Sequence, residues 1–529
     1  MLMCGTVAYQ TANAQLFIDQ ATFTIQTGAT VTVQGDVTSN VNIQGTGKVI
    51  LKGTANQNVN MNGNSLPSLE VDNASNVTLT GNAKVANNLQ FTNGKILLGT
   101  NNLTLAAAAT TSGAGTSKFV ETNGTGQLLK EVSSNVTAFE MPVGAGTAYR
   151  PAFVTTNGTY SSTANVGIRV LGTAHPNRPV KLSDFIAAYW PVTRTGVTGT
   201  VTVAGQYQDA ADITGTEANL RGYFYDGTEW SSTNGTNDAA LNRVGTTFAA
   251  NGALYGMDKF VYVKAKAFLQ APFNTSTGVM SDALRTPSNL IPLTDPYRSA
   301  PYTTSFGHIN NSGAETAAAS VFADQASTND NIVDWVFLEL RNSNVSPGNT
   351  VLQTRSALVQ RDGDIVDIDG ASPVTFNNTA NGNYTIAVRH RNHLGLSADP
   401  SSNLYAAAEA KAAAPTMDFT TATDAQLFGT AAAFTTGGGK TLMWGGNANF
   451  NGNVRFIGLA NDKDYLLLTA PSNGLGNNPS AVLSNVYSPS DVNMNRNVRY
   501  IGLANDKDFM LINTLGSSAA NVRNQTLPN

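Results

Sequence analysis

Charge and cysteine are both scarce in this chain of 529 residues. Charged residues make up 12% of it, the formal net charge is −4, and Cys4 is the only cysteine. A nucleic-acid-binding protein normally carries a basic stripe, and this chain has none, so we expect no nucleic-acid partner. No segment holds about 18 uninterrupted apolar residues, so the sequence predicts no membrane-spanning helix.

Catalytic motifs are missing as well. The chain contains no Gly-x-Ser-x-Gly elbow and no His-Glu-x-x-His helix. Its one Gly-Lys-Thr triplet begins at Gly439, but Phe434 stands where a phosphate-binding loop requires another glycine. Residues 15–110 hold almost none of the acids and bases that lyase chemistry on a β-solenoid would need. We therefore expect no enzymatic activity.

The first fourteen residues are similar to the end of a secretory signal peptide. A short apolar run leads to Ala12-Asn13-Ala14, a small-x-small cleavage pattern, and then to Gln15. The basic segment that normally precedes the apolar run is absent, so either the start of the signal is truncated or the likeness is accidental. Cleavage after Ala14 would remove Cys4 and leave no disulfide. The expected localisation is secreted, either extracellular or at the cell surface.

Asn, Thr, Gly, Ala and Ser supply most of the polarity, which favours many short strands joined by tight turns. Over residues 15–111, runs such as "ATVTVQG" and "LEVDNASNVTLTGN" alternate apolar and polar residues and close on Gly or Asn. Their apolar pairs recur at steps of roughly ten or twenty residues. This pattern predicts a parallel β-helix or solenoid, with a β-sandwich as the alternative.

Two further β-rich domains are expected at 112–258 and 259–420. Longer strands with aromatic residues, such as "NLRGYFYDGTEW" and "IVDWVFLELRN", favour β-sandwiches. The stretch "LYAAAEAKAAAPTMDF" is the one good candidate for a helix or a linker. Trp190 and Trp230 are interpreted as core aromatics, and the alternative is that these two or Trp335 stack on sugars.

Two polar clusters are candidate sites. His390 and His393, three residues apart, could share a metal ion, but a solvated strand end or a local hydrogen-bonding role is the simpler interpretation. The acidic run in "RDGDIVDIDG" could hold paired catalytic carboxylates or a cation. Its alternation predicts a solvated hairpin with Asp367 and Asp369 on one face.

The end of the chain repeats itself. "NVRFIGLANDKDYLLL" starts at Asn453 and "NVRYIGLANDKDFMLI" at Asn497, 44 positions later (497 − 453). Upstream, oxygen-bearing side chains occupy every second position, as in a calcium-binding EF-hand loop. Gly452 takes the sharp-turn position in the first copy, and Arg496 replaces it in the second. The predicted metal ligands are Asn447, Asn449, Asn451, Asn453, Asp462 and Asp464 in the first copy, and Asp491, Asn493, Asn495, Asn497, Asp506 and Asp508 in the second.

Calcium binding at these loops should be weak, because few of the predicted ligands are carboxylates. A dissociation constant of about 10⁻⁴ to 10⁻³ M is expected. Val454 and Val498 are predicted to link the two loops, and "YLLL" and "FMLI" to begin short helices. The alternative is a metal-free loop, since asparagine can hold a turn by bonding its own backbone.

This duplicated loop-helix pattern at 421–529 resembles a dockerin. More closely, it resembles the dockerin-like ends of exported, hemagglutinin-like or adhesin-like surface proteins of Bacteroidetes-type bacteria. The element that carries the likeness is Asn-Asp-x-Asp, at 461–464 and 505–508. Upstream stretches such as "FEMPVGAGTAYRPAFV" and "NYTIAVRHRNHLG" are similar to β-rich domains of the same proteins.

The resemblance implies a secreted structural or adhesive protein that acts by surface attachment or by self-assembly, including as a filament or sheath subunit. Its partner would be another copy of the chain or an extracellular protein. The alternative is a carbohydrate-binding or carbohydrate-active module with a glycan as its ligand.

Overall fold

The computed structural model describes residues 15–179, 181–311, 313–343, 349–401, 405–407, 411, 413–469 and 474–528. The signal-like segment 1–14 lies outside these residues. The chain divides into two compact units, Met1–Lys259 and Phe260–Asn529. Both consist mainly of β-strands, which confirms the predicted all-β class. Among the described residues, no helix is both long enough and apolar enough to span a membrane.

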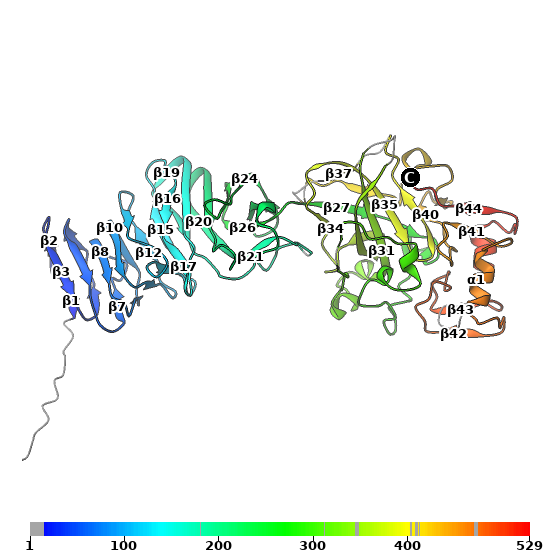
Figure 1. The fold of residues 1–529 in the computed structure, drawn as a ribbon, viewed down its shortest axis with the longest axis horizontal. Helices are drawn as coiled ribbons and strands as arrows, with labels where there is room; N and C mark the ends of the chain where they lie inside the picture. The colour runs from blue at the N-terminus through cyan, green and yellow to red at the C-terminus, as the bar shows by residue number, and fades with distance from the viewer. Residues whose placement is uncertain are drawn as a thin grey trace, which may run out of the picture. The chain divides into compact units, whose positions relative to one another are not determined.

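The first unit begins as a β-solenoid, as predicted, and Figure 1 shows its coils in blue and cyan. Strands from successive coils pair in parallel and in register, so that like positions stack. The column Val33, Leu51, Val71 and Phe91 advances by 18, 20 and 20 residues (51 − 33, 71 − 51, 91 − 71). All four side chains are buried, because period-two alternation turns every second residue inward.

Two long sheets and one short one line the solenoid. The smaller long sheet contains β1 (Leu16–Ile18), β4 (Val37–Ser39), β7 (Gln57–Asn60), β9 (Val77–Leu79), β11 (Ile96–Leu97), β14 (Val120–Glu121), β17 (Val143–Ala145) and β18 (Ala148–Tyr149). The larger one begins with β3 (Thr30–Val33), β6 (Lys48–Leu51), β8 (Ser65–Asp72), β10 (Ala83–Asn93), β12 (Leu103–Leu105) and β15 (Leu128–Glu131). The short one pairs β2 (Phe23–Ile25) with β5 (Ile43–Gly45).

The larger sheet continues past the solenoid without a break. β15 pairs in parallel with β12 on one edge and antiparallel with β19 (Ala152–Ile168) on the other. From there the order runs through β20 (Phe185–Gln206), β26 (Gly252–Asp258), β22 (Leu220–Tyr225) and β23 (Trp230–Ser231). The boundary expected near residue 111 therefore falls inside one continuous sheet.

The tryptophans proposed for sugar stacking are core residues. Trp190, Trp230 and Trp335 are all buried, and each indole N–H donates to a backbone carbonyl at 2.8 to 3.0 Å. A sugar ring cannot reach any of the three faces. The core interpretation is confirmed and the stacking alternative is wrong.

The second unit is built on a nine-stranded sheet whose central strand, β31 (Ile332–Arg341), is buried along its whole length. Its other strands are β27 (Phe260–Lys266), β32 (Val351–Gln360), β33 (Asp364–Val366), β34 (Val374–Asn377), β35 (Gly382–His390), β36 (His393–Ser397), β37 (Tyr405–Ala407) and β38 (Thr416–Asp418). β37 and β38 fall in the stretch considered as a helix. Residues 404, 408–410 and 412 lie outside the described part, and in the rest of that stretch the helical interpretation is wrong because β37 and β38 join the sheet.

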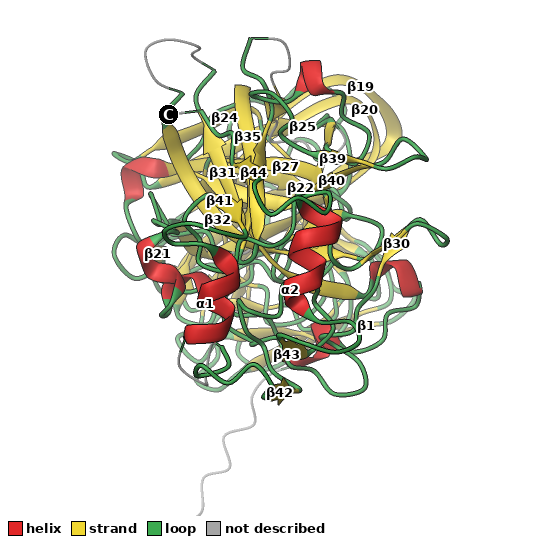
Figure 2. Ribbon diagram, turned by 90° about the vertical axis from the view of Figure 1, so that its right-hand side faces the viewer, coloured by secondary structure: helices red, strands yellow, loops and turns green. Residues whose placement is uncertain are grey.

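The repeat forms what we call the twin-loop module, residues 447–524. Its elements are β41 (Asn453–Arg455), α1 (Asp462–Leu468), β42 (Val482–Ser484), β43 (Asn497–Arg499), α2 (Asp506–Asp508), a π-helical turn (Phe509–Thr514) and β44 (Val522–Asn524). Short helices are present as predicted, but they begin at Asp462 and Asp506, ahead of the "YLLL" and "FMLI" segments expected to start them. Figure 2 shows α1 and α2 on the same face of the second unit. Leu466 and Met510, which are equivalent in the repeat, meet in one small core.

The two loops do not pair with each other. β41 pairs with β44, whereas β43 pairs with β42. Val454 packs near Trp444 and Leu515, while Val498 packs in the other core with Leu466. The predicted direct link through these valines is wrong, because each loop strand finds a partner from outside the repeated sequence.

Candidate functional site

In both copies the loop asparagines bind their own backbone. Asn449 Oδ1 accepts from the N–H of Asn451 at 3.1 Å, and Asn451 Oδ1 accepts from that of Asn453 at 3.0 Å. The second copy repeats these bonds at 3.1 and 3.0 Å along Asn493, Asn495 and Asn497. Such successive Asx turns shape a loop from its own atoms, as the metal-free interpretation requires.

The same asparagines tie each loop to the turn that follows it. The Nδ2 groups of Asn449 and Asn451 both donate to Ala460 O, at 2.8 and 3.1 Å. In the second copy the corresponding distances to Ala504 O are 2.9 and 3.1 Å. Ala460 and Ala504 have φ angles of 53°, so both turns adopt the same left-handed conformation.

The three polar side chains of the Asn-Asp-x-Asp element have different structural roles. Asn461 caps α1 by accepting from the N–H of Asp464 at 2.8 Å, and Asn505 does the same for Asp508. The first aspartate, Asp462 or Asp506, is fully buried and accepts from the backbone N–H of Arg455 (2.9 Å) or Arg499 (2.8 Å).

The second aspartate of the element faces solvent instead. Asp464 and Asp508 lie in the first helical turn, and their side chains are 44% and 45% exposed. Each pairs with the preceding lysine and accepts from its capping asparagine at 2.7 Å. Of the predicted acidic ligands, these two are the ones that do not enter the loop interior.

Burial gives the interior carboxylates unusual affinity for protons. Burial raises the pKa of Asp462 to about 7 despite the backbone donors around it. In the second copy, burial also raises the pKa of Asp491 to about 7, although Arg391 opposes the shift. Burial and the neighbouring Asp491 charge raise the pKa of Asp506 well above its usual range.

The first copy presents neutral oxygens where the second has a carboxylate. Asn447, the equivalent of Asp491, is buried, and its Oδ1 has no hydrogen-bond partner; the same holds for Asn453 Oδ1. Among the described residues no three His, Cys, Asp or Glu side chains converge as a metal group. Calcium here would therefore depend on amide and carbonyl oxygens with one or two carboxylates, a donor set that fits weak binding.

The loops start at the tip of one hairpin of the large sheet. Asn392, in the turn between β35 and β36, accepts from the backbone N–H of Asn447 at 3.1 Å. Its Nδ2 donates to Asp491 O at 2.8 Å. Asn392 therefore touches the first position of both loops, and the module is assembled around it.

A buried ion pair lies directly beneath this tip. Asp334, near the start of β31, accepts from Arg391 Nε at 2.8 Å and from the Tyr487 hydroxyl at 2.7 Å. Burial alone would raise the pKa of the Asp334 carboxyl, but the Arg391 charge and these hydrogen bonds outweigh it and lower the pKa to about 2. Arg391 also donates to Ser488 O, which ties the pair to the module.

His390 and His393 belong to the same buried network and are not solvated. The N–H of Ala271 donates to His393 Nε2 at 3.2 Å, so the proton of this ring lies on Nδ1. That proton faces Asn392 Oδ1 (2.8 Å) and His390 Nδ1 (3.0 Å). His390 then donates from Nε2 to Asp334 at 3.2 Å. Burial lowers the pKa of both rings, so both are neutral; the predicted hydrogen-bonding role is confirmed and the solvated one is wrong.

Arg496, which breaks the loop pattern, has a structural role. It keeps the left-handed conformation of Gly452, with φ angles of 76° and 78° respectively. Its N–H donates to Asp491 Oδ2 at 2.9 Å, and its guanidinium contacts Thr286 O and Ser288 Oγ. The arginine docks the second loop onto segment 286–288, a contact that the first loop lacks.

Both copies form the same surface pocket. The two pockets have volumes of about 570 and 460 Å³. Their ten lining residues correspond one to one at a spacing of 44: Asn449, Asn451, Gly458, Leu459, Ala460, Asn461, Asp464, Tyr465, Leu468 and Thr469 in the first, and Asn493, Asn495, Gly502, Leu503, Ala504, Asn505, Asp508, Phe509, Ile512 and Asn513 in the second. Leu459 and Leu503 on their rims are 90% and 89% exposed.

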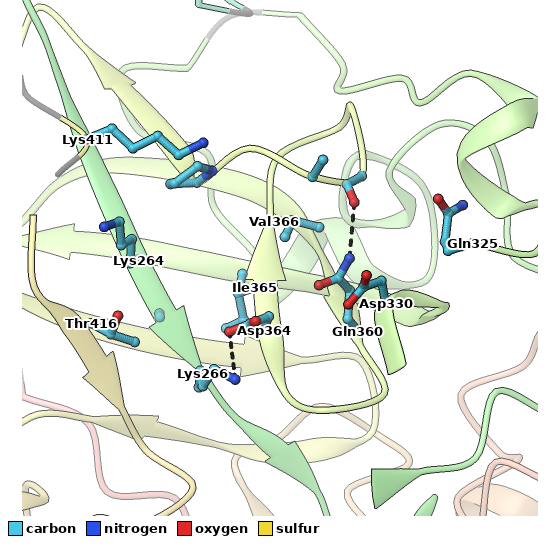
Figure 3. Close-up of a pocket in the computed structure, with 14 residues that line it drawn as sticks. Lys264, Lys266, Gln325, Asp330, Gln360, Asp364, Ile365, Val366, Lys411 and Thr416 are labelled. Carbon is cyan, nitrogen blue, oxygen red and sulfur yellow. Dashed lines mark hydrogen bonds and ion pairs between the residues drawn. The ribbon is translucent and has the colours of Figure 1, made fainter. Parts of the chain in front are cut away.

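A third pocket, of about 490 Å³, lies beside β27 and β33. Figure 3 shows Lys264 and Lys411 toward one end and Gln325, Asp330 and Gln360 toward the other. Charged and amide groups that line a cavity of this size can bind a hydroxyl-rich ligand.

The acidic run near this pocket is only partly solvated. Asp367 is buried and pairs with Arg355 at 2.6 Å, whereas Asp369 is exposed. Asp364 instead pairs with Lys266 at 3.0 Å. The prediction that Asp367 and Asp369 share a solvated face is therefore wrong.

Comparison with protein-family models, with curated proteins and with solved structures finds no match. Sequence reasoning missed Asp334 as an organising residue. Its signal was present, since it is the one acid among the first seven residues of the apolar run "IVDWVFL". A charge at that position of a central strand requires a buried partner.

The variant Arg391→Met should lower the free energy of unfolding by about 3 to 5 kcal/mol, because it leaves Asp334 buried without a counter-charge. The double variant with Asp334→Asn should recover part of that loss. Urea denaturation of the full chain measures both. Lys266→Met, at a partly exposed ion pair, is the control and should cost less than about 1 kcal/mol. A loss below that value for Arg391→Met would contradict the assignment.

Proposed function

We propose that this protein is a secreted structural or adhesive component that acts by attachment or self-assembly and not by catalysis. The observation that carries the proposal is the pair of identical exposed turns, Ile457–Ala460 and Ile501–Ala504, with a nearly fully exposed leucine in each. A leucine in water adds little to folding stability, so its exact repetition on two surfaces points to contact with something else.

The finer architecture belongs to the same proposal. We interpret 112–258 and 259–420 as sandwich-like and 421–529 as a dockerin-like module, as in the exported Bacteroidetes-type proteins that the sequence resembles. The shared core of the two loop-helix units supports the duplicated module. In a dockerin-like module the two loops would face each other directly. Here the strand of each loop pairs instead with a segment outside the repeat, and in this respect the module differs from that pattern.

Calcium is proposed to stabilise the module weakly. It would lie among Asp491, Asn493, Asn495, the Asn497 carbonyl and Asp506 in the second loop. The first loop, with Asn447, Asn449, Asn451, the Asn453 carbonyl and Asp462, should bind more weakly, because it has one carboxylate fewer. The ion would compensate the buried negative charge that now favours protonation.

Calcium at about ten to a hundred times its dissociation constant should stabilise the module by about 1.4 to 2.7 kcal/mol. The folded-state pKa values of Asp462 and Asp491 lie near 7, above the unfolded value, so without calcium stability falls as the pH rises from about 4 to about 7. The gain from calcium should therefore be larger at pH 8 than at pH 5, as measured by calorimetric unfolding with calcium or chelator.

Two matched variants test the assignment of this site. Asp506→Asn should remove most of the calcium response. It should also lower the metal-free midpoint, because the new amide nitrogen then faces a backbone N–H donor of the loop. Asp508→Asn, on the exposed helical turn, should keep the response. Asn447→Asp should increase the response, since it gives the first loop the carboxylate of the second. Equal gains at both pH values, or equal effects of the two Asp→Asn variants, would contradict calcium binding here.

Self-assembly is tested on the purified full chain by sedimentation velocity and electron microscopy with calcium and with a chelator. We expect particles larger than the monomer in calcium and smaller ones after chelation. A chain that remains monomeric at high concentration in calcium would remove the self-assembly part of the proposal.

The second candidate function is glycan binding at the pocket of Figure 3, which its charged and amide lining favours. A glycan array probed with the full chain should then show a signal that Asp330→Ala combined with Gln325→Ala abolishes. An array without signal for the native chain would reject this candidate and favour protein contacts.

A further inference from the structure

We propose that the twin pockets are a self-recognition surface, in which the exposed leucines of one chain enter the pockets of a second copy of the same chain. This inference depends on the self-assembly part of the proposed function, and it names the surface responsible. It rests on the shape, polarity and charge that each site presents twice.

Each site carries both halves of an apolar contact. Leu459 projects from the rim with 90% of its surface exposed, and the pocket beside it is walled by Tyr465 and Leu468. The second copy repeats the arrangement with Leu503, Phe509 and Ile512. A projecting leucine next to a cavity of aromatic and aliphatic side chains is complementary to a rotated copy of itself, which is the requirement for a two-fold contact.

The charges around each site are self-complementary too. Lys463 and Asp464 are neighbours at the first pocket, and Lys507 and Asp508 take the same places at the second. Each pocket lining contains one carboxylate and no cation. A two-fold contact places the lysine of one copy against the aspartate of the other at both ends, so like charges need not meet.

Two equivalent sites on one chain should bind a second copy more tightly than a single site would. Figure 2 shows α1 and α2, which border the two pockets, on one face of the second unit. A second copy approaching that face can meet both sites at once. The second contact is then intramolecular, which raises the affinity without any new kind of interaction.

The test is sedimentation velocity of the full chain in calcium over about 1 to 100 µM, the range in which a modest interface assembles. Leu459→Asp and Leu503→Asp should each weaken association by about 30-fold, as expected for a central apolar contact, and the double variant by about 1,000-fold. Both leucines are so exposed that folding should be unaffected, which circular dichroism checks.

Two control variants replace other exposed apolar residues. Leu241→Asp, at a residue 49% exposed on the first unit, should associate like the native chain. Phe17→Asp, at a residue 67% exposed on the first solenoid strand, should also associate. Association that survives the double leucine variant and is lost in Phe17→Asp would overturn this inference and leave self-assembly intact. A native chain that stays monomeric would overturn both.

Charge reversal at the rims provides an independent test of the two-fold contact. Lys463→Glu with Lys507→Glu makes both rims acidic, and Asp464→Lys with Asp508→Lys makes both basic. Each double variant alone should associate about 10-fold more weakly, because like charges then face each other. An equimolar mixture of the two should regain association as a mixed dimer. A mixture no better than its components would overturn the two-fold contact.

Discussion

A carboxylate in the centre of an apolar sheet cannot remain without a counter-charge, and Asp334 imposes that constraint on the whole second unit. It lies on β31, a central strand that is buried from end to end. Its charge is balanced by Arg391 at the turn of the neighbouring hairpin and by a hydroxyl from Tyr487 in the module. Because removal of either charge alone is costly, the hairpin tip and the module are held in one arrangement.

The position of the twin loops follows from that tip. Asn392 contacts the first residue of each loop, one through its backbone carbonyl and the other through its side-chain amide, so the two copies are placed around a single residue. One difference between the copies follows from different neighbours: a side chain at Gly452 would have only Gln525 within reach, whereas Arg496 reaches segment 286–288. The exposed turns are identical in the two copies, and the leucine of each projects into solvent. Buried residues such as Asp462 and Asp506 are identical too, so the feature that supports recognition as the role of the outer surface is the exposure of the two repeated leucines.

The solenoid was predictable because its signal is local. Alternation fixes which residues point inward, and the spacing of Val33, Leu51 and Val71 fixes the coil length. The helical interpretation of "LYAAAEAKAAAPTMDF" failed for the opposite reason. Alanine favours a helix in isolation, but Thr416–Asp418 pairs with β27, about 150 residues earlier, and tertiary pairing outweighs such a weak preference.

The candidate site was predicted in part. The asparagine spacing located both loops, and Asx turns give them the predicted shape. The roles of the acids were not readable from spacing, because Asp462 and Asp464 are two residues apart and yet one is buried and the other exposed. Both lie in the first turn of α1, which points the two side chains in different directions. The solvated interpretation of His390 failed because burial of a strand end depends on what packs over it, here the distant module.

Strongly shifted pKa values often mark catalytic groups, yet the most perturbed groups of the second unit are sealed from solvent. Asp334, His390 and His393 satisfy one another in a closed network, and Asp506 binds the backbone of its own loop. None of these four lines any of the three pockets described above. Their energetic role is to fix the frame that presents Leu459 and Leu503. A rigid charged interior beneath a repeated apolar surface suits a protein that binds, because a preformed surface loses less conformational entropy on contact.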